Sequence, residues 1–442
     1  MEDILLKYKK IFDEALTLFK NNNFVSAEEK FEEVLKQFPQ RVSVLTNLLA
    51  VKMKLKKFYD SERLISQLIQ IDSSNKEAIF NNAILLAEKG FFDQSLNQID
   101  NFISLKNLSN YDLSEAYSFR GVLYSKLGLF SQSLNEHKKA ERQCKDNYLA
   151  KWNLGLSYLL NGNFEKGFQL YEYRFLKNNS KFRNTVKTVE EIKNKNILVL
   201  GEQGFGDIIQ FSRYLPLLQQ HVQELTFLPP LELFDIFNNT NIKVIKSFNP
   251  KDYDFIIPLM SLPYIFQTNL KTIPSSNYLA SNSIKKKLNS KKINIGLSWS
   301  GRNTYPYDFL RSIPLQQLES IYSLDPNKFQ FYCLQKDIRV SDQSCFDQSN
   351  IVYFENNSFA DIAKIILDLD LVISSDTSIL HLAATLQVKT FGLIPYCPDW
   401  RWLLNGKSSP WYPSLHIYRC NNNNDWTTVI DKIIKDINVK FA

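Results

Sequence analysis

A spacing of 34 residues recurs through the first part of this 442-residue chain. Five segments carry a small residue followed four positions later by a larger one, and the small residues lie 34, 34, 38 and 34 positions apart. The pairs are Ala27/Phe31, Ser61/Ile65, Ser95/Ile99, Ser133/His137 and Gly167/Tyr171. A fixed period of this length indicates stacked units that each need a neighbour to bury their apolar faces. We therefore expect a helical repeat region over residues 1–176.

Each small residue lies in the second of two amphipathic helical patterns. Gly90, Gly128 and Gly162 stand at turns between helices, and Pro39 follows the first unit where a helix should stop. Period, small positions and turn glycines together resemble the tetratricopeptide repeat. Two departures are Lys52, where an aromatic residue is usual, and an insertion at residues 105–113. The resemblance implies a concave face that holds a segment of another protein; the alternative is that the helices only extend the molecule or mediate self-association.

Composition excludes several classes of function. The net charge of +7 comes from interspersed acidic and basic residues, and no basic helix with interleaved aromatics predicts nucleic-acid binding. Five scattered cysteines without a CxxC pair, and four histidines that do not cluster, favour a reduced cytoplasmic protein without a structural zinc site. No run approaches the roughly 18 apolar residues that a membrane-spanning helix needs.

After the repeats, the chain changes character. Residues 177–195 are polar and without sustained periodicity, which indicates a linker. Residues 196–284 and 292–442 each alternate apolar runs of strand type with helical patterns, and a lysine-rich stretch separates them. Such alternation predicts two α/β halves, each with a parallel sheet covered by helices, and suggests a ligand cleft between the halves.

The sequence ILVLGEQGFGDIIQFSRYLP (residues 197–216) predicts a strand, a glycine loop and a helix. Gly201, Gly204 and Gly206 let a ligand approach the backbone, and the helix start favours negative charge. Asp207 opens the helix and has two interpretations of equal weight. It is either a helix-capping acid or a carboxylate that removes a proton from an acceptor group.

A second strand-to-helix turn occupies residues 374–386. Asp376, Thr377 and Ser378 precede an apolar helical pattern, and His381 lies one turn into it. Hydroxyls and free N–H groups in this arrangement suit a phosphate or diphosphate, although capping explains Asp376 and Thr377 equally well. Further along, the aromatic segment PYCPDWRWLLNGKSSPWYP favours a role in closing the core.

Several stretches resemble one family in combination. They are GEQGFGDIIQFSRYLP, IGLSWSG followed by RSIPL, LQKD, DLVISSDTSILHLAATL, CPDWRWLL with SPWYP, and GFQLYEYRF at the end of the repeats. Together they look like bacterial tetratricopeptide-repeat glycosyltransferases, which are related to lipopolysaccharide heptosyltransferases and distantly to protein O-linked N-acetylglucosamine transferases. The resemblance implies a GT-B fold, in which two Rossmann-like halves face a cleft and the C-terminal half binds a nucleotide sugar.

The resemblance also implies roles for individual residues. Asp207 corresponds to the candidate base. The remaining matched positions, which surround the nucleotide sugar and its phosphates, are Gly204, Gly206, Trp299, Arg311, Gln335, Lys336, Asp376, Thr377, Ser378 and His381. Enzymes of this type need no metal and no cofactor beyond the nucleotide-sugar co-substrate, and the expected activity is an inverting hexosyl or related transfer.

Departures from the family pattern keep alternatives open. Gln387 and Thr390 stand where the family usually has a glycine and then a proline. We expect sugar transfer to an acceptor, most simply a protein presented by the repeats. One alternative is a non-enzymatic adaptor with a degenerate transferase domain, and another is a heptosyltransferase-like enzyme acting on a saccharide or lipid-linked glycan.

Overall fold

The computed structural model describes residues 2–177, 184–274, 278–279, 288, 291–305, 307–355, 358–421 and 425–442. The chain divides into two compact units, Met1–Asn153 and Leu154–Ala442. Most of the lysine-rich stretch between the two predicted α/β halves, and the end of the first half, lie outside the described residues.

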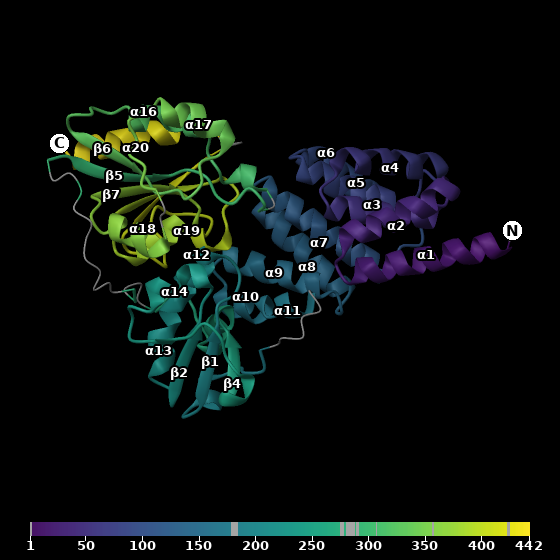
Figure 1. The fold of residues 1–442 in the computed structure, drawn as a ribbon, viewed down its shortest axis with the longest axis horizontal. Helices are drawn as coiled ribbons and strands as arrows, with labels where there is room; N and C mark the ends of the chain where they lie inside the picture. Colours follow the sequence, from purple (N-terminus) through teal and green to yellow (C-terminus); the bar gives the residue numbers. More distant parts are fainter. Residues whose placement is uncertain are drawn as a thin grey trace. The chain divides into compact units, whose positions relative to one another are not determined.

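Unit 1 is an array of antiparallel helix pairs joined by short turns (Figure 1). Its helices are α1 Glu2–Lys20, α2 Phe24–Gln37, α3 Val42–Lys54, α4 Phe58–Ile71, α5 Lys76–Glu88, α6 Phe92–Ile103, α7 Asn110–Lys126, α8 Phe130–Gln143 and the first part of α9 Tyr148–Leu160. This architecture confirms the expected tetratricopeptide-like repeat. The predicted insertion becomes a turn that leads into α7, whose start is fixed by reciprocal hydrogen bonds between Ser109 and Asp112.

The small residues of the repeat lie where two helices meet. Ala27, Ser61, Ser95 and Ser133 are all buried, and the Ser95 hydroxyl donates a 2.6 Å hydrogen bond to the Ala83 carbonyl of the partner helix. The turn glycines also have the expected role. Gly90 and Gly128 adopt φ values of 86° and 75°, a left-handed conformation that glycine allows without strain and that commonly ends a helix.

Lys52, the departure from the repeat pattern, is a buried cation in the interior of unit 1. Its ammonium group lies 2.5 Å from Glu28 and 2.6 Å from Glu32. Burial alone would lower the pKa of Lys52, but the hydrogen bonds that its ammonium group donates to these carboxylates raise the pKa above its ordinary value. The lysine therefore stays charged, and an ion pair replaces the apolar contact that an aromatic residue would make.

Unit 2 contains the end of α9 and two parallel sheets. Its further helices are α10 Phe164–Tyr171, α11 Arg174–Lys177, α12 Phe205–Phe211, α13 Leu215–Gln219, α14 Leu231–Phe237, α15 Leu262–Ile265, α16 Glu319–Tyr322, α17 Val340–Asp347, α18 Phe359–Ile366, α19 Ser378–Thr385 and α20 Thr427–Lys440. Its strands are β1 Asn196–Leu200, β2 Glu224–Leu228, β3 Lys243–Val244, β4 Phe255–Pro258, β5 Ile293–Ser298, β6 Phe329–Cys333, β7 Leu371–Ser375, β8 Thr390–Ile394 and β9 Leu415–Arg419.

The first sheet has the parallel order β3-β2-β1-β4. In an open sheet of this kind, ligands bind beyond the carboxyl ends of the strands where the winding reverses, here between β1 and β4. The glycine loop after β1 begins at this position. The strand order thus places residues 201–207 where a doubly wound sheet holds its ligand.

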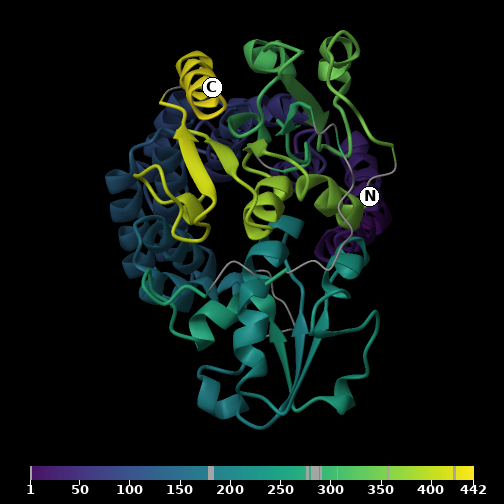
Figure 2. The same cartoon turned by 90° about the vertical axis from the view of Figure 1, so that its left-hand side faces the viewer.

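The second sheet has the parallel order β6-β5-β7-β8-β9, and its winding reverses between β5 and β7. Figure 1 shows α16 and α20 on one face and α18 and α19 on the other, and Figure 2 shows α20 above the strands from a second direction. Apolar residues of β5 to β8 and of α20 form one continuous core. The loops after Ser298 and Ser375 meet at the reversal point.

The predicted parallel α/β halves are confirmed, with differences in detail. The apolar run at residues 351–354, which alone would predict a strand, forms only an isolated bridge between Val352 and Tyr332 in this described segment. Three elements were not predicted from the sequence: α17, β9 and α20. The aromatic segment does close a core, because Trp400 and Trp411 pack against Phe211 of α12 and against Phe164 and Phe168 of α10.

No helix within the described ranges has both the length and the apolar character needed to cross a membrane.

We predict that Gly121→Ala destabilises unit 1. A Cβ atom at this position would lie 2.5 Å from Nε2 of His137, a buried ring atom that lies 3.1 Å from the Ser118 carbonyl. Forcing a methyl group into such a contact costs about 1–3 kcal/mol of unfolding free energy. Urea unfolding followed by circular dichroism measures this cost.

The matched control is Gln132→Ala, an exposed change on α8 that should shift stability by less than about 0.5 kcal/mol. In a His137→Ala background the loss of unfolding free energy caused by Gly121→Ala should be smaller, because the imidazole ring that the new methyl group would contact is absent. An unchanged cost in that background would show that the contact with His137 is not its cause.

Candidate functional site

The glycine loop leads from β1 into α12 through a constrained backbone. The Gly201 amide donates a 2.9 Å hydrogen bond to the Leu228 carbonyl, and a Cβ at Gly201 would lie 3.1 Å from Pro230 Cδ. Gln203 then adopts a left-handed φ of 68°. Asp207 Oδ2 accepts a 2.9 Å hydrogen bond from the Gly204 amide, so the predicted capping contact of Asp207 is present.

The other carboxylate oxygen of Asp207 forms an ion pair with Arg401 of the aromatic segment. The guanidinium also contacts Asp399 at 2.6 Å, and Arg401 is only 7% exposed. Burial raises the pKa of Asp207, and the positive charge of Arg401 opposes this rise. Asp207 is therefore a half-buried carboxylate engaged at both oxygens.

The second predicted turn lies at the start of α19. Thr377 occupies the capping position, but its side chain makes no capping hydrogen bond; its hydroxyl lies 3.2 Å from Ser374 Oγ and 3.4 Å from Ser298 Oγ. The first N–H groups of α19 thus have no side-chain cap. Burial, and then the charge of Asp399, raises the pKa of Asp376 to about 6.

His381 lies where α19 meets α12. A Cβ at Gly206 would lie 2.8 Å from His381 Cδ2 and 3.5 Å from the Cα of Ser378, so only glycine fits there. His381 Nδ1 pairs with the Tyr412 hydroxyl at 2.9 Å, and its ring stacks on Trp402. Burial, and then two nearby arginines, lower the pKa of His381 well below its ordinary value, so the imidazole is neutral near pH 7.

Arg311 lies across from α19 in the loop after β5. Its Nη1 donates a 3.3 Å hydrogen bond to the Asp376 carbonyl, and its guanidinium lies 4.3 Å from the centre of the Tyr305 ring. Its Nε pairs with the buried carboxylate of Asp308 at 3.0 Å, and Arg339 contacts the same carboxylate. The structure therefore places Arg311 beside Asp376, and it adds Arg339 and Asp308, which the family resemblance did not assign.

Three other predicted residues lie in different surroundings. Trp299 is fully buried, and its indole N–H donates to Asp342 Oδ2 at 2.9 Å. Gln335 is buried and accepts hydrogen bonds from the Trp299 and Ser300 amides at 2.7 and 2.6 Å, so it shapes the loop after β5. Lys336 is exposed. The structure thus brings Gly204, Gly206, Asp207, Arg311, Asp376, Thr377, Ser378 and His381 to facing loops, whereas Trp299 and Gln335 support them from the core.

Arg174, at the start of α11, also contacts the glycine loop. It is 3% exposed, and it forms hydrogen bonds to Glu202 at 2.6 and 3.2 Å and to Ser261 at 2.8 Å. Glu172 contacts the same guanidinium at 2.5 Å. This buried arginine fixes Glu202, the second residue of the loop. The stretch GFQLYEYRF was the only sequence signal for it.

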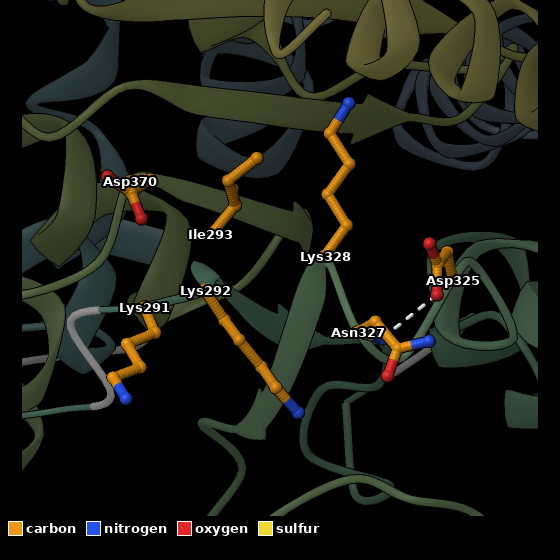
Figure 3. Close-up of a pocket in the computed structure, with 7 residues that line it drawn as sticks. All are labelled: Lys291, Lys292, Ile293, Asp325, Asn327, Lys328 and Asp370. Carbon is orange, nitrogen blue, oxygen red and sulfur yellow. Dashed lines mark hydrogen bonds between the residues drawn. The ribbon is translucent and has the colours of Figure 1, made fainter.

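An open surface hollow of about 520 Å³ lies at the amino ends of β5, β6 and β7, the opposite edge from Asp376. Figure 3 shows that its lysines Lys291, Lys292 and Lys328 point in three different directions. Cations that do not converge cannot hold one anion, so the hollow is not the candidate site. Within the part of the chain that the structure describes, no cluster of three or more His, Cys, Asp or Glu side chains is arranged to hold a metal ion.

No protein-family model matches the sequence, and no curated protein matches it either. Solved structures of helical repeat proteins do match. A MamA protein is 18% identical over 40% of this chain and 94% of its own, with a TM-score of 0.30. A thermophilic TPR protein from Thermus thermophilus is 17% identical over 39% and 93%, with a TM-score of 0.35. A Rap protein complexed with competence and sporulation factor is 18% identical over 39% and 54%, with a TM-score of 0.36. At these scores the likeness carries no further argument, and the repeat assignment rests on the helices themselves.

We predict that Asp376→Asn stabilises unit 2 at pH 7.5 but not at pH 4.5. The pKa of Asp376 rises on folding from 3.8 to about 6, so between these values the folded chain binds more protons than the unfolded chain. The free energy of unfolding therefore falls as the pH rises through this interval. An asparagine at this position has no charge to bury, so the variant does not lose stability as the pH rises through this interval.

Thermal unfolding at several pH values tests this. The control Asp431→Asn removes an exposed carboxylate on α20 and should leave the pH dependence unchanged. An equal effect of Asp376→Asn at both pH values would contradict the assignment of a raised pKa to Asp376.

Proposed function

We propose that this chain is a metal-independent glycosyltransferase of GT-B type that uses a nucleotide sugar, in which the repeats of unit 1 bind an acceptor protein or a partner. The observation that carries the proposal is the close packing of α12 and α19, which brings the loops at the reversal points of two parallel sheets together. Asp207 comes from one sheet, and Arg311, Asp376 and His381 come from the other. The proposed compartment is the cytoplasm.

Each group has a proposed role. Asp207 removes the proton from the acceptor group while that group attacks the sugar. A carboxylate whose pKa is raised by burial is a stronger base than an exposed carboxylate of ordinary pKa. The uncapped first turn of α19 and the Arg311 guanidinium stabilise the negative charge that develops on the leaving nucleotide. Neutral His381, fixed by Tyr412, orients the start of α19 without adding charge.

The two contacts of the Asp207 carboxylate favour a second candidate function, that of a scaffold without catalysis. Both of its carboxylate oxygens already have partners, Gly204 and Arg401, as in a structural capping acid. In that case unit 2 serves as a scaffold, and the chain is a repeat-based adaptor without transferase activity. The two candidates differ in nucleotide binding, which a thermal-shift screen with UDP, GDP, ADP, CMP and their sugars, with and without magnesium, measures directly. Ligand at a hundred times its Kd stabilises by about 2.7 kcal/mol.

We predict that Asp207→Asn lowers turnover about 10²- to 10⁴-fold, which is the usual contribution of a positioned base. Binding of the nucleotide that gives a thermal shift should persist, since the proposed donor groups lie on the second sheet. Hydrolysis of the matching nucleotide sugar, and its transfer to a candidate acceptor, are the measurements.

The control Asp431→Asn makes the same charge change on the exposed face of α20 and should leave turnover unchanged. Full turnover by a folded Asp207→Asn protein would remove Asp207 as the base. A metal-independent shift with one nucleotide supports the transferase, whereas no shift with any of them supports the adaptor.

A further inference from the structure

Arg401 is the side chain that joins the two sheets of unit 2 electrostatically. Its Nη2 contacts Asp207 in the first turn of α12, and its Nη1 contacts Asp399 at 2.6 Å. The Asp399 carboxylate also accepts a hydrogen bond from the Arg401 amide at 3.0 Å, so this acid is held locally. Asp207 comes from a different element and is the partner that can separate from Arg401.

The guanidinium of Arg401 is nine-tenths buried, and its Nε–H has no hydrogen-bond partner among the described residues. A buried donor without a partner carries an energetic cost that a ligand oxygen can remove. A guanidinium presents its donors as a planar fork that matches the oxygens of a phosphate group. Arg401 also lies near the start of α19, whose first N–H groups have no side-chain cap.

The charges around Arg401 determine how an anion could enter. Three guanidinium groups and four carboxylates face one another here, and the carboxylates therefore leave no excess of positive charge. These groups are Arg311, Arg339, Arg401, Asp207, Asp308, Asp376 and Asp399. An anion can use Nε and Nη2 of Arg401 together, as one edge of the fork, only if Asp207 moves away from Nη2.

We propose that Arg401 exchanges partners: it holds Asp207 when the site is empty, and it binds a phosphate or diphosphate group of the ligand when Asp207 is displaced. The inference rests on the proposed function, because the exchange would free the Asp207 carboxylate for the acceptor only after the phosphate-bearing ligand has bound. Arg401 is then a ligand-binding residue for the anion and a positioning residue for Asp207. The family resemblance assigned neither role to it.

The test measures binding of inorganic pyrophosphate to the full-length protein by isothermal titration calorimetry. Asp207→Asn removes the competing charge, so it should bind pyrophosphate at least about tenfold more tightly than the wild type. Arg401→Gln should bind at least about tenfold more weakly. Asp431→Asn, with the same charge change on an exposed helix, should match the wild type.

A double-mutant cycle separates exchange from a general effect of charge. If Asp207 acts by occupying Arg401, the tightening caused by Asp207→Asn must disappear in the Arg401→Gln background. Equal tightening in both backgrounds, equal binding by the wild type and both single variants, or no binding by any of them would overturn the proposal. Should Arg401→Gln fail to fold, Arg401→Lys keeps the charge but loses the fork, and pyrophosphate binding by this variant as tight as that of the wild type would overturn the proposal equally.

These results can be told apart from a failure of the proposed function. Pyrophosphate binding requires neither sugar nor acceptor. If the cycle shows coupling but no nucleotide sugar is hydrolysed or transferred, the exchange stands and the transferase fails. If sugar transfer depends on Asp207 but pyrophosphate binding is unchanged in Arg401→Gln, the proposed transferase activity is supported and the proposed partner exchange is wrong.

Discussion

The arrangement of the candidate site depends on the absence of a side chain at Gly206. The His381 ring approaches this residue so closely that even a methyl group would overlap with it, and α12 can therefore lie directly against α19. Because α12 follows β1 of the first sheet and α19 follows β7 of the second, this one contact brings together the carboxyl-end loops of the two sheets. The histidine in this contact is uncharged. Burial keeps His381 neutral, and the arginines nearby lower its pKa further, so the contact introduces no extra charge.

Aromatic residues and a second buried arginine hold this contact in place. Arg213 follows α12 and is 2% exposed; it donates to the carbonyls of Gln210 and Trp411 at 2.8 Å and lies 4.8 Å from the centre of the Tyr412 ring. Among the described residues no carboxylate is within ion-pair distance of it. Carbonyl groups and ring faces therefore solvate its charge. Since Tyr412 in turn pairs with His381, the orientation of that histidine depends on the whole aromatic segment.

Sequence patterns predicted those features that depend on local periodicity. The 34-residue spacing located the helix pairs, and the alternation of apolar runs with helical patterns predicted the two parallel sheets. The buried residues of α20, Val429, Ile430, Ile433 and Ile437, follow a helical spacing that would have predicted this helix, whereas β9 is a short strand whose structure depends on pairing with β8. The same reason explains the site. The glycines and Asp207 have a local signature, whereas the Asp207–Arg401 pair joins residues 194 positions apart, and no spacing rule indicates it.

Buried charged side chains, such as those of the candidate site, contribute little to the stability of a fold. Burying a carboxylate and a guanidinium removes both from water, and well-packed apolar residues of similar volume are often as stable or more so. Asp376 adds a carboxylate whose pKa is raised because its charged form is disfavoured. An apolar core lies directly beneath, where Trp299, Leu297 and Ile373 show that these sheets pack well without charge. Stability alone therefore does not account for acids and arginines at the meeting point of two sheet edges, whereas the proposed exchange of an anionic ligand uses both.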